Sequence, residues 1–362
     1  MTRKIPANSM MFSGILLVLV IVLMIIMDSN PIGLSKNALS KTQKTREILR
    51  LPGKMSWAGD DGFFNFDRGV LKRLDGGGKV FWEKRLEGKE LLWIGPGGFT
   101  VNRDSTLEMW NAAGELEFRK DNFLENPAVL SFEGDFLLLA GKLKDRDYAA
   151  LLNKKGTVLW LIPVDGRIIS GRSSKSGSYT VLNLMDENLS GKMVLVNSEG
   201  LILWQIDRTV MILLSGIMPD GVEAVAEDRV FKADFEGRII REQIFQDAIF
   251  RADIGQDGYM VVAVKQREAK LTSGQRPKII MLDPECRVKW SYILERQPLY
   301  IKKHGEFVYI VYDDEILVLS REGLLTSSIK SGNIKDIDVV DISRLIINHN
   351  DGSSLIAISG RR

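Results

Sequence analysis

The chain has 362 residues, of which 45% are hydrophobic and 27% are charged, and its 49 Lys and Arg nearly balance 47 Asp and Glu for a net charge of +2. Such a chain can bury a substantial core, and its charge balance provides no global field that would attract nucleic acid or an acidic polymer. The single cysteine, Cys286, excludes an internal disulfide and a zinc site built from several cysteines.

The first predicted element is a membrane-spanning helix at residues 11–27, MFSGILLVLVIVLMIIM, which follows a short charged tail at residues 1–10. A helix of this length spans about 26 Å, close to the thickness of a thin hydrocarbon core. The run lacks the small residues of a signal-peptide cleavage site and the polar face of a core helix, which favours an uncleaved signal anchor over both alternatives. The charged tail favours a cytoplasmic N-terminus, so we expect single-pass anchoring in the cell membrane with the bulk of the chain extracytoplasmic.

Residues 28–53 are predicted to form a polar linker, whose root-mean-square reach if flexible is roughly 28 Å. The globular part, at residues 54–362, would then be tethered near the bilayer.

A turn recurs along residues 54–362, and MVLVNSEGLILW at Met193–Trp204 is a clear example. Asp, Asn or Ser opens the turn, and a glycine closes it three residues later, except where Cys286 takes the glycine's place. A turn that ends on a left-handed glycine is a common connection between antiparallel strands. The closing residues are Gly78, Gly114, Gly156, Gly200, Gly237, Cys286 and Gly323.

An aromatic residue often stands four positions after the closing residue. These aromatic residues are Trp82, Phe118, Trp160, Trp204 and Trp290. Recurrence at one offset favours rings that pack between neighbouring repeats over scattered core aromatics. Arg241 and Ser327 occupy this position in the fifth and seventh copies, where we expect different packing.

A second series of turns alternates with the first and predicts the fold. Its glycines are Gly62, Gly98, Gly134, Gly177, Gly221, Gly258, Gly305 and Gly352. Two hairpins in each period of about 40 residues predict four antiparallel strands per repeat, the blade of an all-β propeller. The second series, which forms the inner turns, has one turn more than the first series, which forms the outer turns. The last blade is therefore either incomplete or shares strands with the first. Seven or eight blades remain open, with eight favoured.

Runs such as LVNSEGLILW and LLNKKGTVLW resemble the tryptophan-docking repeat of the PQQ-like (pyrroloquinoline-quinone-like) β-propeller family, over about residues 54–362. One branch of that family contains quinoprotein dehydrogenases, which implies a bound quinone, a calcium ion, a catalytic aspartate and often adjacent cysteines. This chain is shorter and has one cysteine. The other branch contains non-catalytic scaffolds, such as the propeller lipoprotein of outer-membrane barrel assembly, although that protein's lipidated cysteine is missing here.

No catalytic or metal-binding constellation is apparent in the sequence, so we expect no catalytic residue, cofactor or metal. His304 and His349 fall in predicted inner turns, which favours exposed turn residues over metal ligands. The acidic runs 227–228 and 313–315 are interpreted as tight turns between strands. A nucleophile elbow, a phosphate-binding loop and a dinucleotide fingerprint are all missing.

The loops between the two middle strands of each repeat form the predicted partner surface. Because antiparallel strands alternate in direction, these loops share one face with the connections between blades, and the tight turns occupy the other face. The predicted partner-binding residues are Lys144, Arg146, Arg267, Lys270, Arg276 and Lys278. These cations favour an acidic protein or anionic lipid head groups, the alternative being merely solvated loops.

The sequence therefore predicts a monomeric, membrane-anchored β-propeller that acts as a non-catalytic protein-interaction scaffold at the cell envelope. Its partners would be a protein on the long-loop face and the bilayer at residues 11–27, without nucleic acid. The alternatives are a quinone-dependent dehydrogenase and an extracytoplasmic sensor with a ligand in the central channel.

Overall fold

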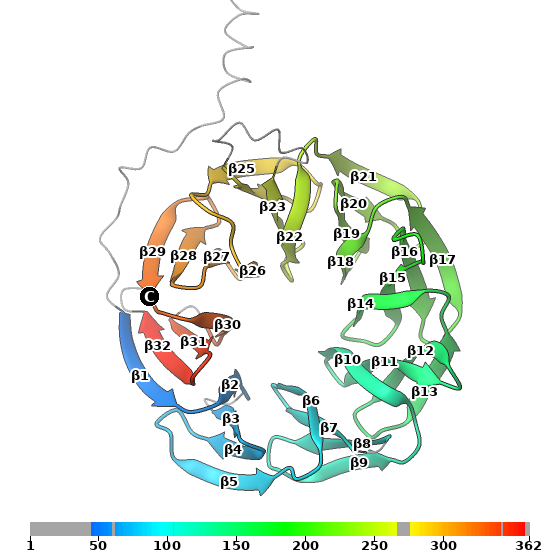
Figure 1. Ribbon diagram of the computed structural model, residues 1–362. Coiled ribbons are helices and arrows are strands. Elements are labelled where there is room, and N and C mark those ends of the chain that lie inside the picture. Colours follow the sequence, from blue (N-terminus) through cyan, green and yellow to red (C-terminus); the bar gives the residue numbers. More distant parts are fainter. Residues whose placement is uncertain (1–44, 60–61, 104, 266–275, 342, 359–362) are drawn as a thin grey trace, which may run out of the picture.

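The computed structural model describes residues 45–59, 62–103, 105–265, 276–341 and 343–358. In these ranges the regular elements are strands, arranged as eight four-stranded antiparallel sheets around a central axis (Figure 1). The predicted all-β propeller is confirmed, and it has eight blades.

The predicted helix at residues 11–27 and the tail at 1–10 lie outside the described residues, as does the linker up to residue 44. Within the part of the chain that the structure describes, no helix is long and apolar enough to cross a membrane.

Each blade runs from an inner strand beside the axis to an outer strand on the rim. Blade 1 consists of β2 (Lys54–Trp57), β3 (Phe63–Asp67), β4 (Val70–Leu74) and β5 (Val80–Arg85), and blade 2 of β6 (Glu90–Gly95), β7 (Gly98–Arg103), β8 (Thr106–Asn111) and β9 (Leu116–Lys120). Blade 3 consists of β10 (Glu125–Glu133), β11 (Phe136–Leu143), β12 (Arg146–Asn153) and β13 (Val158–Pro163), and blade 4 of β14 (Arg167–Ser173), β15 (Tyr179–Met185), β16 (Gly191–Asn197) and β17 (Ile202–Arg208).

Blades 5 to 8 follow the same order, and only the last takes a strand from elsewhere in the chain. Blade 5 consists of β18 (Ile212–Met218), β19 (Gly221–Ala226), β20 (Arg229–Ala233) and β21 (Ile239–Ile244), and blade 6 of β22 (Ala248–Ile254), β23 (Met260–Lys265), β24 (Lys278–Leu282) and β25 (Val288–Ile293). Blade 7 consists of β26 (Tyr300–His304), β27 (Phe307–Val311), β28 (Glu315–Ser320) and β29 (Leu325–Lys330), and blade 8 of β30 (Ile334–Val339), β31 (Arg344–His349), β32 (Ser353–Ile358) and β1 (Thr45–Leu51).

The eighth blade is closed by strands from both ends of the propeller. Its sheet has the order β1-β32-β31-β30, with Thr45 opposite Ile358 and Leu51 opposite Ser353. This arrangement confirms strand sharing between the last blade and the start of the propeller, which seals the ring. It also corrects the predicted boundary at residue 54, because β1 lies inside residues 28–53. The side chains of β1 are largely exposed on the rim, so its sequence is polar and looks like a linker.

The core is a ring of apolar layers, one between each pair of neighbouring blades. In the layer between blades 3 and 4, for example, Leu151 and Trp160 pack against Leu182 and Val196. Within the described residues eight such clusters occur, one for each interface around the ring. The stability of each blade therefore depends on its two neighbours.

The recurring turn and its tryptophan lock neighbouring blades together. Asn197 Oδ1 accepts hydrogen bonds from the N–H groups of Glu199 and Leu201 at 3.0 and 2.9 Å, and Gly200 closes the turn with a φ of 83°. A Cβ at Gly200 would lie 2.6 Å from the Cβ of Trp160 in blade 3, so glycine is needed for room as well as for its conformation. The predicted packing of the rings between repeats is confirmed.

At the interface between blades 5 and 6, other residues take the places of both the tryptophan and the turn glycine. Arg241 stands in the tryptophan position of blade 5, and Cys286 closes the facing turn of blade 6 with a φ of 59°. Arg241 Nε donates to Glu285 Oε2 at 2.8 Å, and Cys286 is buried beside this ion pair. The two departures noted in the sequence therefore lie at a single interface.

We expect Arg241 and Cys286 to be energetically coupled. Arg241→Trp alone should destabilise the protein by about 1–3 kcal/mol, because the ring would overlap the Cys286 Cβ. Cys286→Gly alone should have a smaller effect, since it relieves the positive φ but removes a buried side chain. The double variant should recover most of the loss. Urea unfolding of the four proteins measures the coupling energy, and additive effects would contradict a shared contact.

Candidate functional site

The two faces of the propeller carry different loops. On one face, which we call the connection face, lie the links between blades and the turns between the second and third strands. Backbone hydrogen bonds join the two kinds of loop, as from Leu86 N–H to Gly69 O and from Phe245 N–H to Asp228 O, both at 2.8 Å. The remaining turns lie on the opposite face, the turn face. The predicted division between the two faces is therefore confirmed.

The described members of the predicted partner-binding set lie on the connection face. Lys144 lies in the middle turn of blade 3 and Arg146 begins β12, whereas Arg276 and Lys278 follow the middle loop of blade 6; all four are exposed. Blades 4 and 5 separate the two pairs, so the cations do not form one patch. The other two predicted residues, Arg267 and Lys270, lie outside the described residues.

Exposed aliphatic side chains lie between and beside these cations. Leu189 in the middle turn of blade 4 is 65% exposed, Ile244 at the end of β21 is 58% exposed, and Ile293 at the end of β25 is 57% exposed. Ile293 lies opposite Lys278 in the pairing of β24 with β25. We call Lys144, Arg146, Leu189, Ile244, Arg276, Lys278 and Ile293 the connection-face arc. The sequence analysis did not identify its aliphatic members.

Leu189 also has an unusual backbone conformation, with a φ of 63°. Leucine rarely adopts this region, which is costly for a side chain with a Cβ. The turn is held by Asp186 Oδ1, which accepts hydrogen bonds from the N–H groups of Asn188 and Ser190 at 2.9 and 2.8 Å. The capped turn thus fixes a large apolar side chain in solvent.

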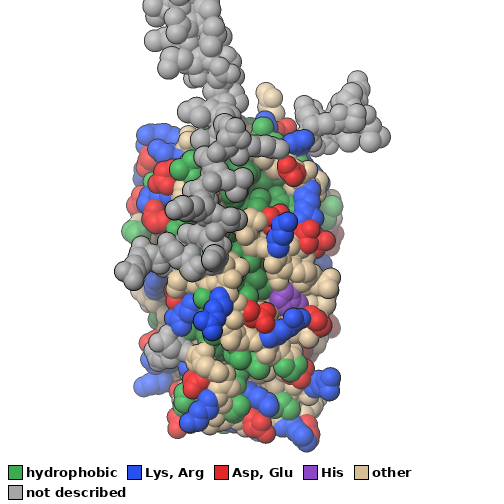
Figure 2. Space-filling view, turned by 90° about the vertical axis from the view of Figure 1, so that its left-hand side faces the viewer, with side chains coloured by type: hydrophobic (Ala, Val, Ile, Leu, Met, Phe, Trp, Pro, Cys, Tyr) green, Lys and Arg blue, Asp and Glu red, His purple; other side chains and the backbone are tan. Residues whose placement is uncertain are grey.

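Other exposed apolar side chains lie on the rim near the turn face. Phe81 is 63% exposed and Ile202 is 56% exposed, and each follows the closing glycine of its own blade. The side of the ring that carries β1 and β29 shows basic and acidic side chains interspersed over the rim (Figure 2). No single sign of charge dominates that side.

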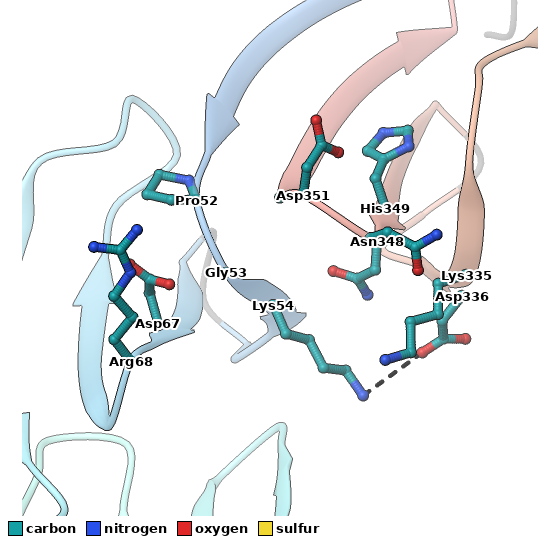
Figure 3. Close-up of a pocket in the computed structure, with 12 residues that line it drawn as sticks. Pro52, Gly53, Lys54, Asp67, Arg68, Lys335, Asp336, Asn348, His349 and Asp351 are labelled. Atoms are coloured by element: carbon teal, nitrogen blue, oxygen red, sulfur yellow. Dashed lines mark ion pairs between the residues drawn. The ribbon is translucent and has the colours of Figure 1, made fainter.

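A pocket of about 330 Å³ lies on the connection face at the seam between blades 8 and 1 (Figure 3). The link from β1 to β2, the turn after β3, the start of β30 and the turn from β31 to β32 surround it. Its lining residues are Pro52, Gly53, Lys54, Asp67, Arg68, Lys335, Asp336, Asn348, His349, Asn350, Asp351 and Gly352.

Hydrogen bonds and ion pairs across the seam set the shape of this pocket. Asn348 Oδ1 accepts a hydrogen bond from Met55 N–H at 3.0 Å and another from the Ser353 hydroxyl. Lys54 Nζ lies 3.7 Å from Asp336 Oδ2, so an ion pair also links the two blades. Close backbone approach is possible because Gly53 has a φ of 80°, and a Cβ there would lie 2.3 Å from Phe66 O.

The position of His349 corrects one prediction. The inner connection of blade 8 lies between the end of β30 at Val339 and the start of β31 at Arg344, so His349 and Gly352 belong to the middle turn instead. This inner turn contains no glycine, which is why the sequence pattern led to the next glycine along the chain. His304 ends β26 on the turn face, and His349 ends β31 on the connection face. Among the described residues no group of three His, Cys, Asp or Glu could hold a metal ion.

A buried carboxyl group lies at the altered interface between blades 5 and 6. Glu223 in β19 is fully buried, and neither carboxylate oxygen has a hydrogen-bond partner within the described ranges. Lys232 Nζ is 4.0 Å from Glu223 Oε1, but it donates to Asp220 Oδ2 at 2.8 Å. Burial raises the pKa of Glu223 to about 8, and Lys232 only partly opposes this shift.

The thiol of Cys286 belongs to the same region. Burial, with a smaller contribution from Glu223, raises the pKa of Cys286 to about 12. The thiolate is therefore disfavoured, and this side chain is unsuited to nucleophilic chemistry.

No family model and no curated protein matches this chain. Solved structures do. BamB from Moraxella catarrhalis is similar with a TM-score of 0.60 at 12% identity, over 86% of this chain and 99% of that one. Dihydro-heme d1 dehydrogenase NirN has a TM-score of 0.59 at 11% identity, over 86% and 75% of the two chains. The WD40 domain of SCAP from fission yeast has a TM-score of 0.55 at 10% identity, over 89% and 99%.

At these identities the similarity establishes the fold. An enzyme and two other propellers share the architecture with this chain, so function must be argued from its own surface.

Proposed function

We propose that this chain is a non-catalytic protein-interaction scaffold that binds a protein partner through the connection-face arc. Residues 11–27 anchor it in the cell membrane, with the propeller at the extracytoplasmic side. The observation that carries the proposal is that three consecutive blades each present a mostly exposed aliphatic side chain on the connection face or at the adjoining rim, at Leu189, Ile244 and Ile293.

The composition of the arc suits a protein partner. Interfaces combine an apolar centre, which provides binding energy, with a charged rim, which provides orientation. Leu189, Ile244 and Ile293 supply the apolar part, and Lys144 and Lys278 lie at its two ends. A complementary partner would present apolar side chains flanked by acidic ones. The closed ring holds the blades in fixed relative positions, so little ordering is needed when the partner binds.

Photo-crosslinking in cells tests this surface. A photoreactive amino acid is placed singly at Leu189, Ile244 or Ile293 in the full chain, with Phe81 and Ile202 on the turn-face rim as controls of similar exposure. We expect one discrete adduct with the same partner from the three arc positions, weakened by Lys278→Glu. Adducts from the control positions alone, or none from the arc, would contradict the proposal.

The same cells test the anchor. The full chain should remain with the membrane after alkaline extraction, whereas a chain that begins at residue 28 should be released. In a Cys286→Ser background, a cysteine placed at Ser273 should react with an impermeant maleimide in intact cells. Labelling only after lysis would show that the propeller is cytoplasmic.

A further inference from the structure

The amide of Asn348 has unused hydrogen-bonding capacity inside the seam pocket. The side chain is 3% exposed, and its orientation is fixed because Met55 N–H can only donate, which identifies the acceptor as Oδ1. The Nδ2 group is therefore a donor, and it has no partner within the described part of the chain. Buried donors are nearly always paired with a protein group, a water or a ligand, so an acceptor that reaches Nδ2 from the pocket would be stabilised there.

Two lysines approach the same part of the pocket from opposite sides of the seam. Lys54 begins β2 in blade 1, Lys335 lies in β30 of blade 8, and both side chains reach toward Asp336 (Figure 3). Asp336 forms an ion pair with Lys54, and Lys335 has no ion pair within the described ranges. This end of the pocket therefore holds two cations and one carboxylate.

The other charges of the pocket largely balance one another. Asp67 and Arg68 contribute one charge of each sign, and Asp351 forms an ion pair with Arg50 at 3.4 Å. His349 Nδ1 donates to Gly332 O at 2.8 Å, so this ring nitrogen is already paired. The excess of positive charge and of free donors is thus concentrated at Lys54, Lys335 and Asn348.

We infer that the seam pocket binds a small molecule that carries a carboxylate or phosphate group. The oxygens of this group accept hydrogen bonds from Asn348 Nδ2, Lys54 and Lys335. Charge-assisted hydrogen bonds of this kind are the strong ones, and a volume of about 330 Å³ is within the range of ligand cavities in proteins. Because the donors come from both sides of the seam, the ligand fastens blade 8 to blade 1.

Thermal unfolding of the full chain in detergent tests this site with two probes. Citrate represents the carboxylate class and inorganic phosphate the phosphate class, both against sodium chloride at equal ionic strength. A ligand that binds only the folded protein raises Tm, by about 3–6 °C when its concentration is a hundredfold above Kd. A saturable rise with one probe supports the site and identifies the class of ligand.

Two variants and a control assign the effect to the pocket. Asn348→Asp keeps an acceptor for Met55 N–H and the Ser353 hydroxyl but replaces the free donor by a negative charge, so the apparent Kd should rise at least about tenfold. Lys335→Ala removes an exposed cation with little risk to the fold and should have a similar effect. Lys79→Ala, an exposed lysine on the turn face, should leave the apparent Kd unchanged.

Two outcomes would overturn the inference. One is the lack of a saturable rise in Tm with both citrate and phosphate. The other is an equal rise in the original protein, Asn348→Asp and Lys335→Ala, which would show a general effect of salt.

Discussion

A chain that begins at residue 52, without β1, is expected to be less stable by at least about 4 kcal/mol than one that begins at residue 45. The loss has two causes. The edge of β32 would no longer be paired, and the apolar cluster of Met55, Phe63, Ile346 and Leu355 would lose its cover from Leu49 and Leu51. At the interface between blades 8 and 1, Leu49 also takes the place that a tryptophan occupies at other interfaces. A Cβ at Gly78, the closing glycine of blade 1, would lie 2.9 Å from Leu49 Cδ1.

Urea unfolding of the two shortened chains measures this difference. Both lack residues 1–44, so only the seven residues of β1 distinguish them. Leu49→Ala in the longer chain should produce a smaller loss, of about 1–2 kcal/mol, since the strand would still pair. Equal unfolding midpoints for the two chains would show that closure by β1 contributes nothing to the ring.

Glu223→Gln is expected to stabilise the protein by up to about 4 kcal/mol at high pH and to have little effect near pH 5. Burial raises the pKa of Glu223 from 4.5 to about 8 in the folded state. Between these values the folded state binds a proton that the unfolded state does not. The stability due to the neutral acid is therefore complete below about pH 4.5 and is lost as pH rises to about 8.

The unfolding free energies of the original protein and Glu223→Gln should be compared from pH 5 to pH 9. The difference should grow with pH and level off above about pH 8, because glutamine has the shape of the neutral acid but cannot ionise. Glu199→Gln is the matched control, since Glu199 is exposed in a turn. A difference that does not depend on pH would show that the pKa of Glu223 is not raised in the folded state.

The blades could be predicted from the sequence because their signals are local. An Asn or Asp that caps a turn and a glycine with positive φ lie within four residues of each other, as at Asn197 and Gly200. The strand β1 could not be predicted in this way. Its partner β32 lies some three hundred residues away, and its exposed side chains give no apolar alternation.

The candidate sites could likewise be predicted only in part from the sequence. The sequence placed Lys144 and Lys278 on the correct face, since the face follows from strand direction. It could not show that Leu189, Ile244 and Ile293 are exposed, because an aliphatic residue in or beside a strand is usually buried. The seam pocket joins Lys54 to Lys335 and Asn348, and only closure of the ring brings these segments together.

The direction of β1 determines on which face of the ring the preceding segment joins the propeller. Because Thr45 pairs with Ile358, the strand starts on the turn face and leaves at Leu51 on the connection face. Any preceding segment therefore joins the propeller on the turn face. With residues 11–27 in a bilayer, a pull on the tether would load the turn-face end of β1. The arc and the seam pocket lie on the opposite face of the ring from that end of β1.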